Sequence, residues 1–357
     1  MSALTTTSQI ESFLDKGYTV LRSEITKEQC EEFLTNSVLP AVKTHSSYIE
    51  NNPDTFSDIP GDMVRDRTTV EGKQLDPIPA SADGRWGALF NDRVLRTFLD
   101  ALHGETGGWE WLHDDNVGWI HIRFPNFTAP SAHDKPLSTA PERPFDGGSW
   151  HVDGAHFNPH KLTSLEQSII VLPMLRDVAF AGGNTIILRN SHKDVINFLH
   201  AAGPNGVSDR RLNEFACYLV MTADTSRFEE VAPCAPGDLL IMHPFVVHSS
   251  SRNTKGNPWR ISFNMGARWS DNKIRKHSPL VRHFSSVLST STHNNKIYYN
   301  RPVFIRGLDR NSYLTSSRDS LAVETRLDKD DRSCEFRFEF FEGDDLNINS
   351  YQLEINK

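Results

Sequence analysis

Residues Pro236 to His248 read Pro-Gly-Asp-Leu-Leu-Ile-Met-His-Pro-Phe-Val-Val-His. The Pro-Gly-Asp turn leads into an apolar run at 239–242, and Pro244 ends that run. A short, continuous apolar run between turn residues is typical of a buried strand. The stretch therefore predicts a strand at 238–242, followed after a break by a histidine at position 248.

Five further segments share this character, because each is short, rich in β-branched or aromatic residues and bounded by turn residues. They are residues 119–124, 168–172, 184–188, 216–221 and 260–267. Several short strands with irregular connections favour a jelly-roll barrel, so the fold class expected is mainly β with flanking helices.

Helices are predicted before these strands. Residues 9–16 form one helix, and a second begins at Thr26, which makes a capping box with Gln29. A third helix is expected over 91–102, with Gly104 as its terminator. We expect one barrel domain over 1–270 that includes these helices, and a C-terminal extension of unknown fold over 271–357 that packs on the barrel.

Composition narrows the class of protein. The 357 residues include 38 Lys and Arg against 46 Asp and Glu, a net charge of −8, which argues against a nucleic-acid partner. No apolar run approaches the roughly 18 residues that span a bilayer, and the first residues lack the order of a signal peptide. The expectation is an intracellular, cytoplasmic protein that acts on a small molecule without a membrane partner.

A His-x-Asp triplet lies at His151 and Asp153, the spacing at which an imidazole and a carboxylate can reach one metal from a single strand end. Alone it is a weak signal, because the same triplet occurs at 113–115 and 192–194. The downstream residues distinguish it. His248 follows the 238–242 strand, and Arg260 opens the next predicted strand.

Two histidines and one carboxylate leave three open positions on an octahedral ion, the arrangement of non-haem Fe(II) oxygenases. A chelating cosubstrate can fill two positions and dioxygen the third. A guanidinium then suits the distal carboxylate of the cosubstrate, because its planar fork binds a carboxylate with two hydrogen bonds. Arg260 is placed for that role. Ser262, one side-chain period further along the strand, could reach the same carboxylate.

The chain resembles the phytanoyl-CoA dioxygenase branch of the Fe(II)/2-oxoglutarate-dependent oxygenases over roughly residues 8–269. The resemblance rests on Trp150-His151-Val152-Asp153, on the segment 183–192, on Pro236-Gly237-Asp238 and on the later His248 and Arg260. In the segment 183–192, Arg189-Asn190 stands where the family has Pro-Gly.

The resemblance implies a double-stranded β-helix, the cupin-like jelly roll. It also implies that His151, Asp153 and His248 bind Fe(II), that Arg260 binds 2-oxoglutarate, and that Ser250 contributes a hydroxyl to the cosubstrate site. The activity implied is oxidation of a C–H bond of a small organic substrate with O2, releasing succinate and CO2. Two alternatives stay open: a metal-binding cupin-type enzyme that does not use 2-oxoglutarate, and a non-catalytic binding barrel.

Overall fold

The computed structural model describes residues 3–41, 69–70, 73–74, 83–84, 86–123, 150–154, 159–162, 168–251, 260–293, 305–307, 313–314 and 336–338. The chain divides into two compact units, Met1–Leu288 and Ser289–Lys357. In the second unit, the described strands form one antiparallel sheet in the order β13 (Tyr313–Leu314), β12 (Ile305–Gly307) and β14 (Phe336–Phe338).

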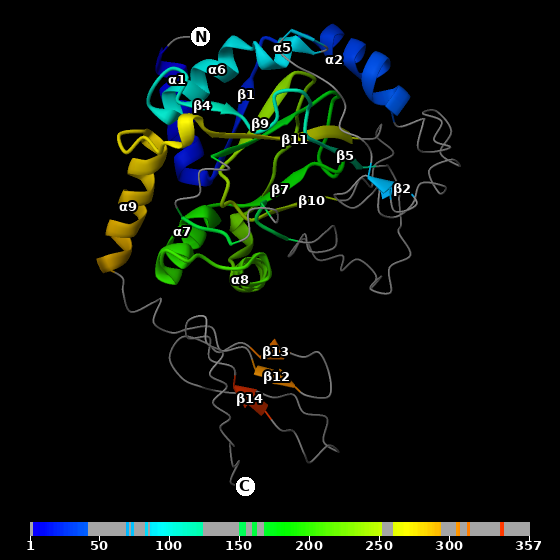
Figure 1. Ribbon diagram of the computed structural model, residues 1–357. Helices are drawn as coiled ribbons and strands as arrows, with labels where there is room; N and C mark the ends of the chain where they lie inside the picture. The colour runs from blue at the N-terminus through cyan, green and yellow to red at the C-terminus, as the bar shows by residue number, and fades with distance from the viewer. Residues whose placement is uncertain are drawn as a thin grey trace, which may run out of the picture. The chain divides into compact units, whose positions relative to one another are not determined.

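A large antiparallel sheet crosses the middle of the first unit (Figure 1). Its strands lie in the order β1, β9, β6, β11 and β4, and β5 pairs with β11 as a sixth strand. Their bounds are Tyr18–Arg22 for β1, Trp109–Trp111 for β4, Trp119–Arg123 for β5, Ile169–Pro173 for β6, Asp238–Met242 for β9 and Arg260–Trp269 for β11. The predicted strand at 238–242 is thus confirmed, and it lies between β1 and β6.

A smaller antiparallel sheet lies beside the large one. It has the order β10 (His248–Ser250), β7 (Thr185–Leu188) and β8 (Phe228–Glu230). A short hairpin of β2 (Thr69–Val70) and β3 (Lys73–Gln74) stands apart from both sheets. The predicted mainly β architecture with flanking helices is confirmed as antiparallel sheets, whereas a closed barrel stays a prediction.

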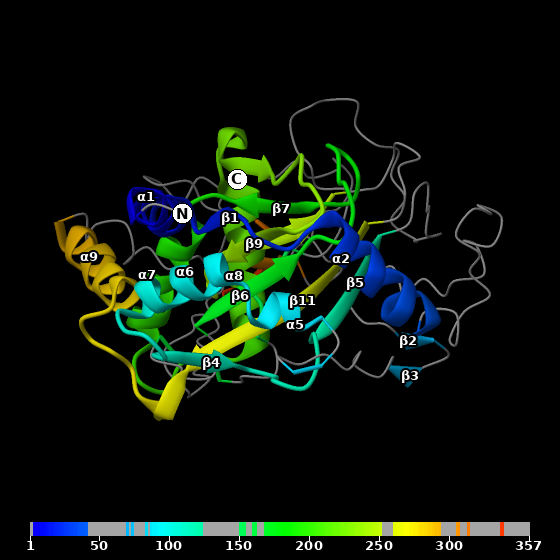
Figure 2. The ribbon, with the colours of Figure 1, turned by 90° about the horizontal axis from the view of Figure 1, so that it is seen from above.

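Four helices cover the outer face of the large sheet (Figure 2). They are α1 (Ala3–Lys16), α2 (Lys27–Phe33), which continues as a π-helical turn over Leu34–Val38, α5 (Gly87–Phe90) and α6 (Arg93–His103). The predicted capping box of Thr26 and Gln29 begins α2, and Gly104, with φ of 84°, ends α6. Asp92 caps α6, which begins at Arg93 rather than at the predicted residue 91, because the Asp92 carboxylate accepts the amide hydrogen of Leu95.

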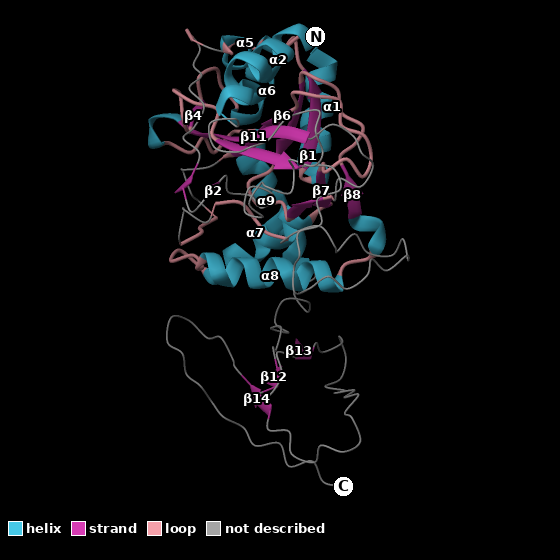
Figure 3. Cartoon of the chain, turned by 90° about the vertical axis from the view of Figure 1, so that its right-hand side faces the viewer, coloured by secondary structure: helices cyan, strands magenta, loops and turns pink. Residues whose placement is uncertain are grey.

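Two further helices, α7 (Ser191–Ala202) and α8 (Asp209–Thr222), pack on the small sheet (Figure 3). The prediction of a strand at 216–221 is wrong, because these residues lie inside α8. Ser208 caps that helix, and Leu212, Phe215 and Leu219 bury one helical face against the small sheet. Helical spacing and an upstream cap therefore outweigh the short β-branched run.

Strand alternation divides the interior into layers. In β6, Ile169 and Val171 face the helices α1, α2, α5 and α6, whereas Ile170 and Leu172 pack with Ile187 of the small sheet. The space between the two sheets is thus lined from both sides. This inner layer is where the predicted ligands lie.

Helix α9 (Pro279–His293) begins in the first unit, where its Leu280 and Val287 are buried in the two helix-covered cores. This packing carries the first unit to Leu288, beyond the predicted boundary at 270. His283 of α9 lies against the buried His192 and His243, with ring centroids 5.3 and 6.3 Å away. We call these three residues the histidine cluster.

Residues 125–148 and most of the predicted extension over 271–357 lie outside the described residues. Within the described part of the chain, no helix has the length and apolar composition that a membrane crossing requires.

Candidate metal centre

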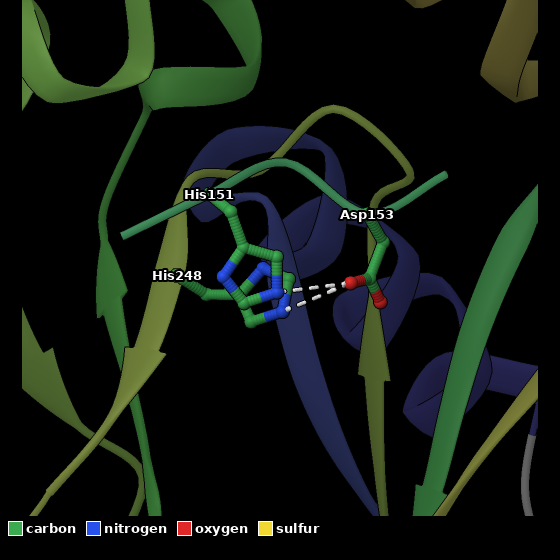
Figure 4. A group of neighbouring side chains, drawn as sticks. All are labelled: His151, Asp153 and His248. Carbon is green, nitrogen blue, oxygen red and sulfur yellow. Dashed lines mark hydrogen bonds and ion pairs between the residues drawn. The ribbon is translucent and has the colours of Figure 1, made fainter. Parts of the chain in front are cut away.

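The structure brings together the three residues predicted to bind a metal (Figure 4). His151, Asp153 and His248 each offer a ligand atom, and these atoms all lie within 4.8 Å of one another. Over the described ranges, no other group of three His, Cys, Asp or Glu side chains converges in this way. Both imidazoles point toward the carboxylate, as the dashed lines in Figure 4 show.

The backbone fixes the separation of the two histidines. His151 and His248 form a β-bridge in which each amide donates to the carbonyl of the other, at 3.1 and 3.0 Å. His151 and Asp153 alternate with Trp150 and Val152, which are buried in the core beneath the small sheet. Because Trp150 and Val152 point into that core, the two intervening ligands point the opposite way, into the layer between the sheets.

Hydrogen bonding sets the tautomer of His248. Its Nδ1 lies 3.1 Å from the carbonyl oxygen of Val246, and a carbonyl can only accept, so Nδ1 carries the hydrogen. In the neutral ring Nε2 therefore carries the lone pair that can bind a metal, and it lies 3.7 Å from Oδ1 of Asp153. Support of this kind by a backbone carbonyl is common for metal-binding histidines.

Asp153 is held as a carboxylate by its surroundings. Burial alone would raise its pKa, but His248, His151 and the amide of Asn264 together hold the pKa well below the usual range. Oδ1 faces the Nε2 atom of His151 at 3.1 Å, whereas Oδ2 accepts a hydrogen bond from Nδ2 of Asn264 at 2.7 Å. A deprotonated acid beside two imidazole nitrogens is a donor set that suits Fe(II).

Arg260 lies at the start of β11 and is only 1% exposed, the largest of the fully buried side chains among the described residues. Its Nη2 atom lies 3.4 Å from the hydroxyl of Thr185 on β7. Thr185 pairs across the small sheet with Ser250, and His248 pairs with Ile187 two residues away. Thr185, which contacts Arg260, and Ile187, which pairs with His248, are thus about 7 Å apart along β7.

The two predicted serines have different surroundings. Ser250 is half-buried opposite Thr185, on the same sheet face as His248. Ser262 is completely buried, and its hydroxyl donates to the carbonyl oxygen of Pro173 at 3.0 Å. Because a serine has a single hydroxyl hydrogen, that of Ser262 is committed to the backbone rather than to a cosubstrate.

Neither of the two competing triplets converges with a third metal-binding side chain in the described part of the chain. His113 and Asp115 are exposed. The ring of His192 donates to the carbonyl oxygen of Leu14, and Asp194 pairs with Arg227 at 2.8 Å. Asp194 also lies in the first turn of α7, where a carboxylate suits the helix dipole.

Sequence reasoning missed two residues of this centre, Asn264 and Thr185. Asn264 could have been found by one more step of strand alternation, because Arg260, Ser262 and Asn264 follow at a spacing of two on β11. Thr185 gave no such signal, since its place beside Arg260 depends on how the two sheets face each other.

No protein-family model matches the chain, and no curated protein matches it in sequence. Among solved structures, the chain is similar to AviO1 from Streptomyces viridochromogenes Tue57, with 14% identity and a TM-score of 0.40 over 76% of this chain and 98% of that one. It is also similar to the epimerase SnoN in complex with Fe3+, alpha ketoglutarate and nogalamycin RO, with 11% identity and a TM-score of 0.45 over 75% and 85%.

A third similar structure is EctD from S. alaskensis with 2-oxoglutarate and 5-hydroxyectoine, with 13% identity and a TM-score of 0.43 over 77% of this chain and 78% of that one. TM-scores below 0.5 are too low to carry an inference about this chain. The nature of the centre therefore follows from its own donor atoms and contacts.

Proposed function

We propose that this chain is an Fe(II)- and 2-oxoglutarate-dependent dioxygenase that oxidises a C–H bond of a small organic substrate and releases succinate and CO2. In this proposal the two sheets are the walls of a double-stranded β-helix, and the reaction takes place between them. The single observation that carries the proposal is the convergence of His151, Asp153 and His248 in the same inter-sheet layer as a buried arginine.

The three ligands fit Fe(II) by number and by type. Two imidazole nitrogens and one carboxylate oxygen occupy three corners of an octahedron and leave three for other ligands. The hydrogen bond from His248 to the carbonyl of Val246 orients one ring, and the backbone bridge sets the distance to the other. The chain thus provides a site with open positions rather than a closed structural one.

Arg260 supports the use of 2-oxoglutarate. A buried guanidinium is costly unless an anion offsets its desolvation. The Nη2 atom of Arg260 contacts the hydroxyl of Thr185, and 2-oxoglutarate would bring a carboxylate to this position. The positions of Thr185 and Ile187 on β7, beside Arg260 and His248 respectively, are about 7 Å apart. This distance is close to the length of a five-carbon diacid. We therefore assign the distal carboxylate of 2-oxoglutarate to Arg260, with Ser250 and Thr185 beside it.

The bound metal, cosubstrate and dioxygen would supply the oxidising chemistry. The chain itself binds and orients them and keeps water from the inner layer. Ile187, Leu172 and Leu240 line this layer with apolar side chains, which strengthens the attraction between the buried charges. His151, Asp153 and Arg260 then set where a substrate must approach.

The test is anaerobic addition of Fe(II) and 2-oxoglutarate to metal-free protein, followed by exposure to air. We expect a weak visible absorption band that needs both additions, and succinate release once oxygen is admitted. His151→Ala should lose both signals, whereas His113→Ala, which changes an exposed histidine of a competing triplet, should keep them. Folded, iron-loaded protein with neither signal would contradict the proposal and favour a 2-oxoglutarate-independent enzyme or a binding barrel.

A further inference from the structure

We propose that Asn264 is a positioning residue that keeps Asp153 bound to the metal through one oxygen only. The inference rests on the proposed metal site and concerns how many positions of the ion stay open. The observation behind it is that the two oxygens of Asp153 have different partners.

The two oxygens of the Asp153 carboxylate face different partners: Oδ1 faces the histidine rings, and Oδ2 faces β11. Oδ1 faces Nε2 of both His151, at 3.1 Å, and His248, at 3.7 Å. Oδ2 faces away from the rings and accepts Nδ2 of Asn264 at 2.7 Å. Because a carboxylate oxygen only accepts, the amide nitrogen rather than the amide oxygen of Asn264 must face it.

The backbone holds Asn264 in place for this contact. Asn264 lies on β11 opposite Trp119 of β5, on the same strand face as Arg260. Its carbonyl group is packed tightly against Gly118, where an added Cβ would lie 2.2 Å from the carbonyl oxygen. Gly118 has a φ of 69°, so the chain there adopts a conformation that favours glycine and admits this close approach. The backbone at Asn264 is therefore fixed against Gly118 and β5, and the side chain starts from a fixed point on the strand.

This contact decides the number of open positions. A carboxylate that bound through both oxygens would turn Oδ2 toward the ion and break the hydrogen bond to Asn264. A hydrogen bond to a charged group is stronger than one between neutral groups, so the single-oxygen mode is favoured while Asn264 is present. With one oxygen and two imidazoles bound, three positions stay open; with two oxygens bound, only two would. A chelating cosubstrate and dioxygen together need three.

The experiment uses Mn(II) as the probe on the full-length, metal-free chain. Its affinity is followed by electron paramagnetic resonance, and the number of bound waters by proton relaxation. We expect Asn264→Leu to raise the dissociation constant about 10–100-fold, as outer-shell changes commonly do, and to lower the number of bound waters by one. Asn264→Ala removes the side-chain amide altogether, so it should lose one water as well, and it serves if the leucine variant does not fold.

The chain contains a matched control on α8. Asn213 also donates to an aspartate, with Nδ2 3.1 Å from Oδ2 of Asp209, and Oδ1 of that aspartate also meets a histidine, His160, at 3.2 Å. Asn213→Leu removes the same type of hydrogen bond away from the centre, so it should leave both Mn(II) readings unchanged.

The outcomes separate the two proposals. Wild-type protein that binds no Mn(II) overturns the metal site and this inference together. Wild-type protein that binds Mn(II) with three waters, while both Asn264 variants keep its affinity and water number, overturns only the role of Asn264. A change in thermal stability alone, equal to that of Asn213→Leu, would likewise show that Asn264 acts as a structural contact.

Discussion

Acidification from pH 7 to pH 5 should destabilise the first unit, because its folded state buries histidines in their neutral form. His192 and His243 of the histidine cluster are fully buried, with ring centroids 4.8 Å apart. The charged groups that face the cluster are Asp15 and Lys193, which pair with each other at 2.9 Å. One acid already paired with a lysine is a poor counter-ion for three imidazoles.

Burial is the main cause of the shifted titration. It lowers the pKa of His192 to about 3 and that of His283 to about 4, and it holds the pKa of His243 well below its usual value. The neighbouring imidazoles and Lys193 add to the lowering, and Asp15 opposes it. A separate buried histidine on α6, His103, has its pKa lowered to about 4, again mainly by burial.

The sign follows from proton linkage. In the unfolded chain a histidine protonates near pH 6.5, whereas His192 and His103 stay neutral in the folded chain down to about pH 3 and 4. Between these values the unfolded chain binds more protons, so stability is retained above pH 6.5 and is lost as the pH falls. At pH 5 the loss is about 2 kcal/mol for each of these two residues.

The assay is urea denaturation at pH 7 and pH 5, followed by tryptophan fluorescence. All seven tryptophans belong to the first unit, so the signal reports on that unit alone. His192→Gln can still donate to the carbonyl of Leu14 and should shrink the loss between the two pH values by about 2 kcal/mol. His200→Gln, which changes an exposed histidine at the end of α7, should not alter it.

Equal stability of the wild-type protein at the two pH values would refute this reasoning. So would a His192→Gln variant whose loss on acidification matches that of the wild type. Because the readout is a difference between two pH values, any constant effect of the substitution cancels. If His192→Gln does not fold, His103→Gln tests the same argument on α6.

Three further predictions concern the centre and the helix that supports it. Asp153→Ala should abolish succinate release and Mn(II) binding while tryptophan fluorescence still shows folded protein; activity that survives would place the metal elsewhere. Arg260→Lys should raise the 2-oxoglutarate concentration for half-maximal succinate release by about 10-fold or more, because an ammonium loses the bidentate fork, and an unchanged value would show that Arg260 does not bind the cosubstrate. Asp92→Ala should lower the free energy of unfolding by about 2–3 kcal/mol in urea, because it removes hydrogen bonds to the amides of Leu95 and Glu24; a change below about 0.5 kcal/mol would contradict that role.

The elements that the sequence predicted well are those marked by local signals. The Pro-Gly-Asp turn and the apolar run after it become β9 with the expected bounds. Thr26 and Gly104 mark a helix start and a helix end because capping depends only on near neighbours in the chain. The prediction of a strand at 216–221 is wrong because these apolar residues fit a strand when they are considered alone. The cap at Ser208 and the helical spacing of the residues before 216 instead favour α8.

The candidate site could be predicted as far as residue types and order allow. His151, Asp153 and His248 were found from their spacing and position, and the structure brings them together. What the sequence could not give is which atom each side chain uses. The donor role of Nδ1 in His248 and the partner of Oδ2 in Asp153 depend on contacts between strands far apart in the chain.

The reciprocal backbone bridge between His151 and His248 has a consequence for how metal binding is linked to folding. Since main-chain atoms rather than the ion join the two segments, little chain entropy remains to be lost when the ion arrives. Metal should therefore stabilise the protein by mass action, with a melting temperature that rises smoothly with metal concentration, instead of converting an unfolded chain into a folded one. Substitution of the residues at positions 151 and 248, in evolution or by design, can then change the preferred metal while the backbone stays the same.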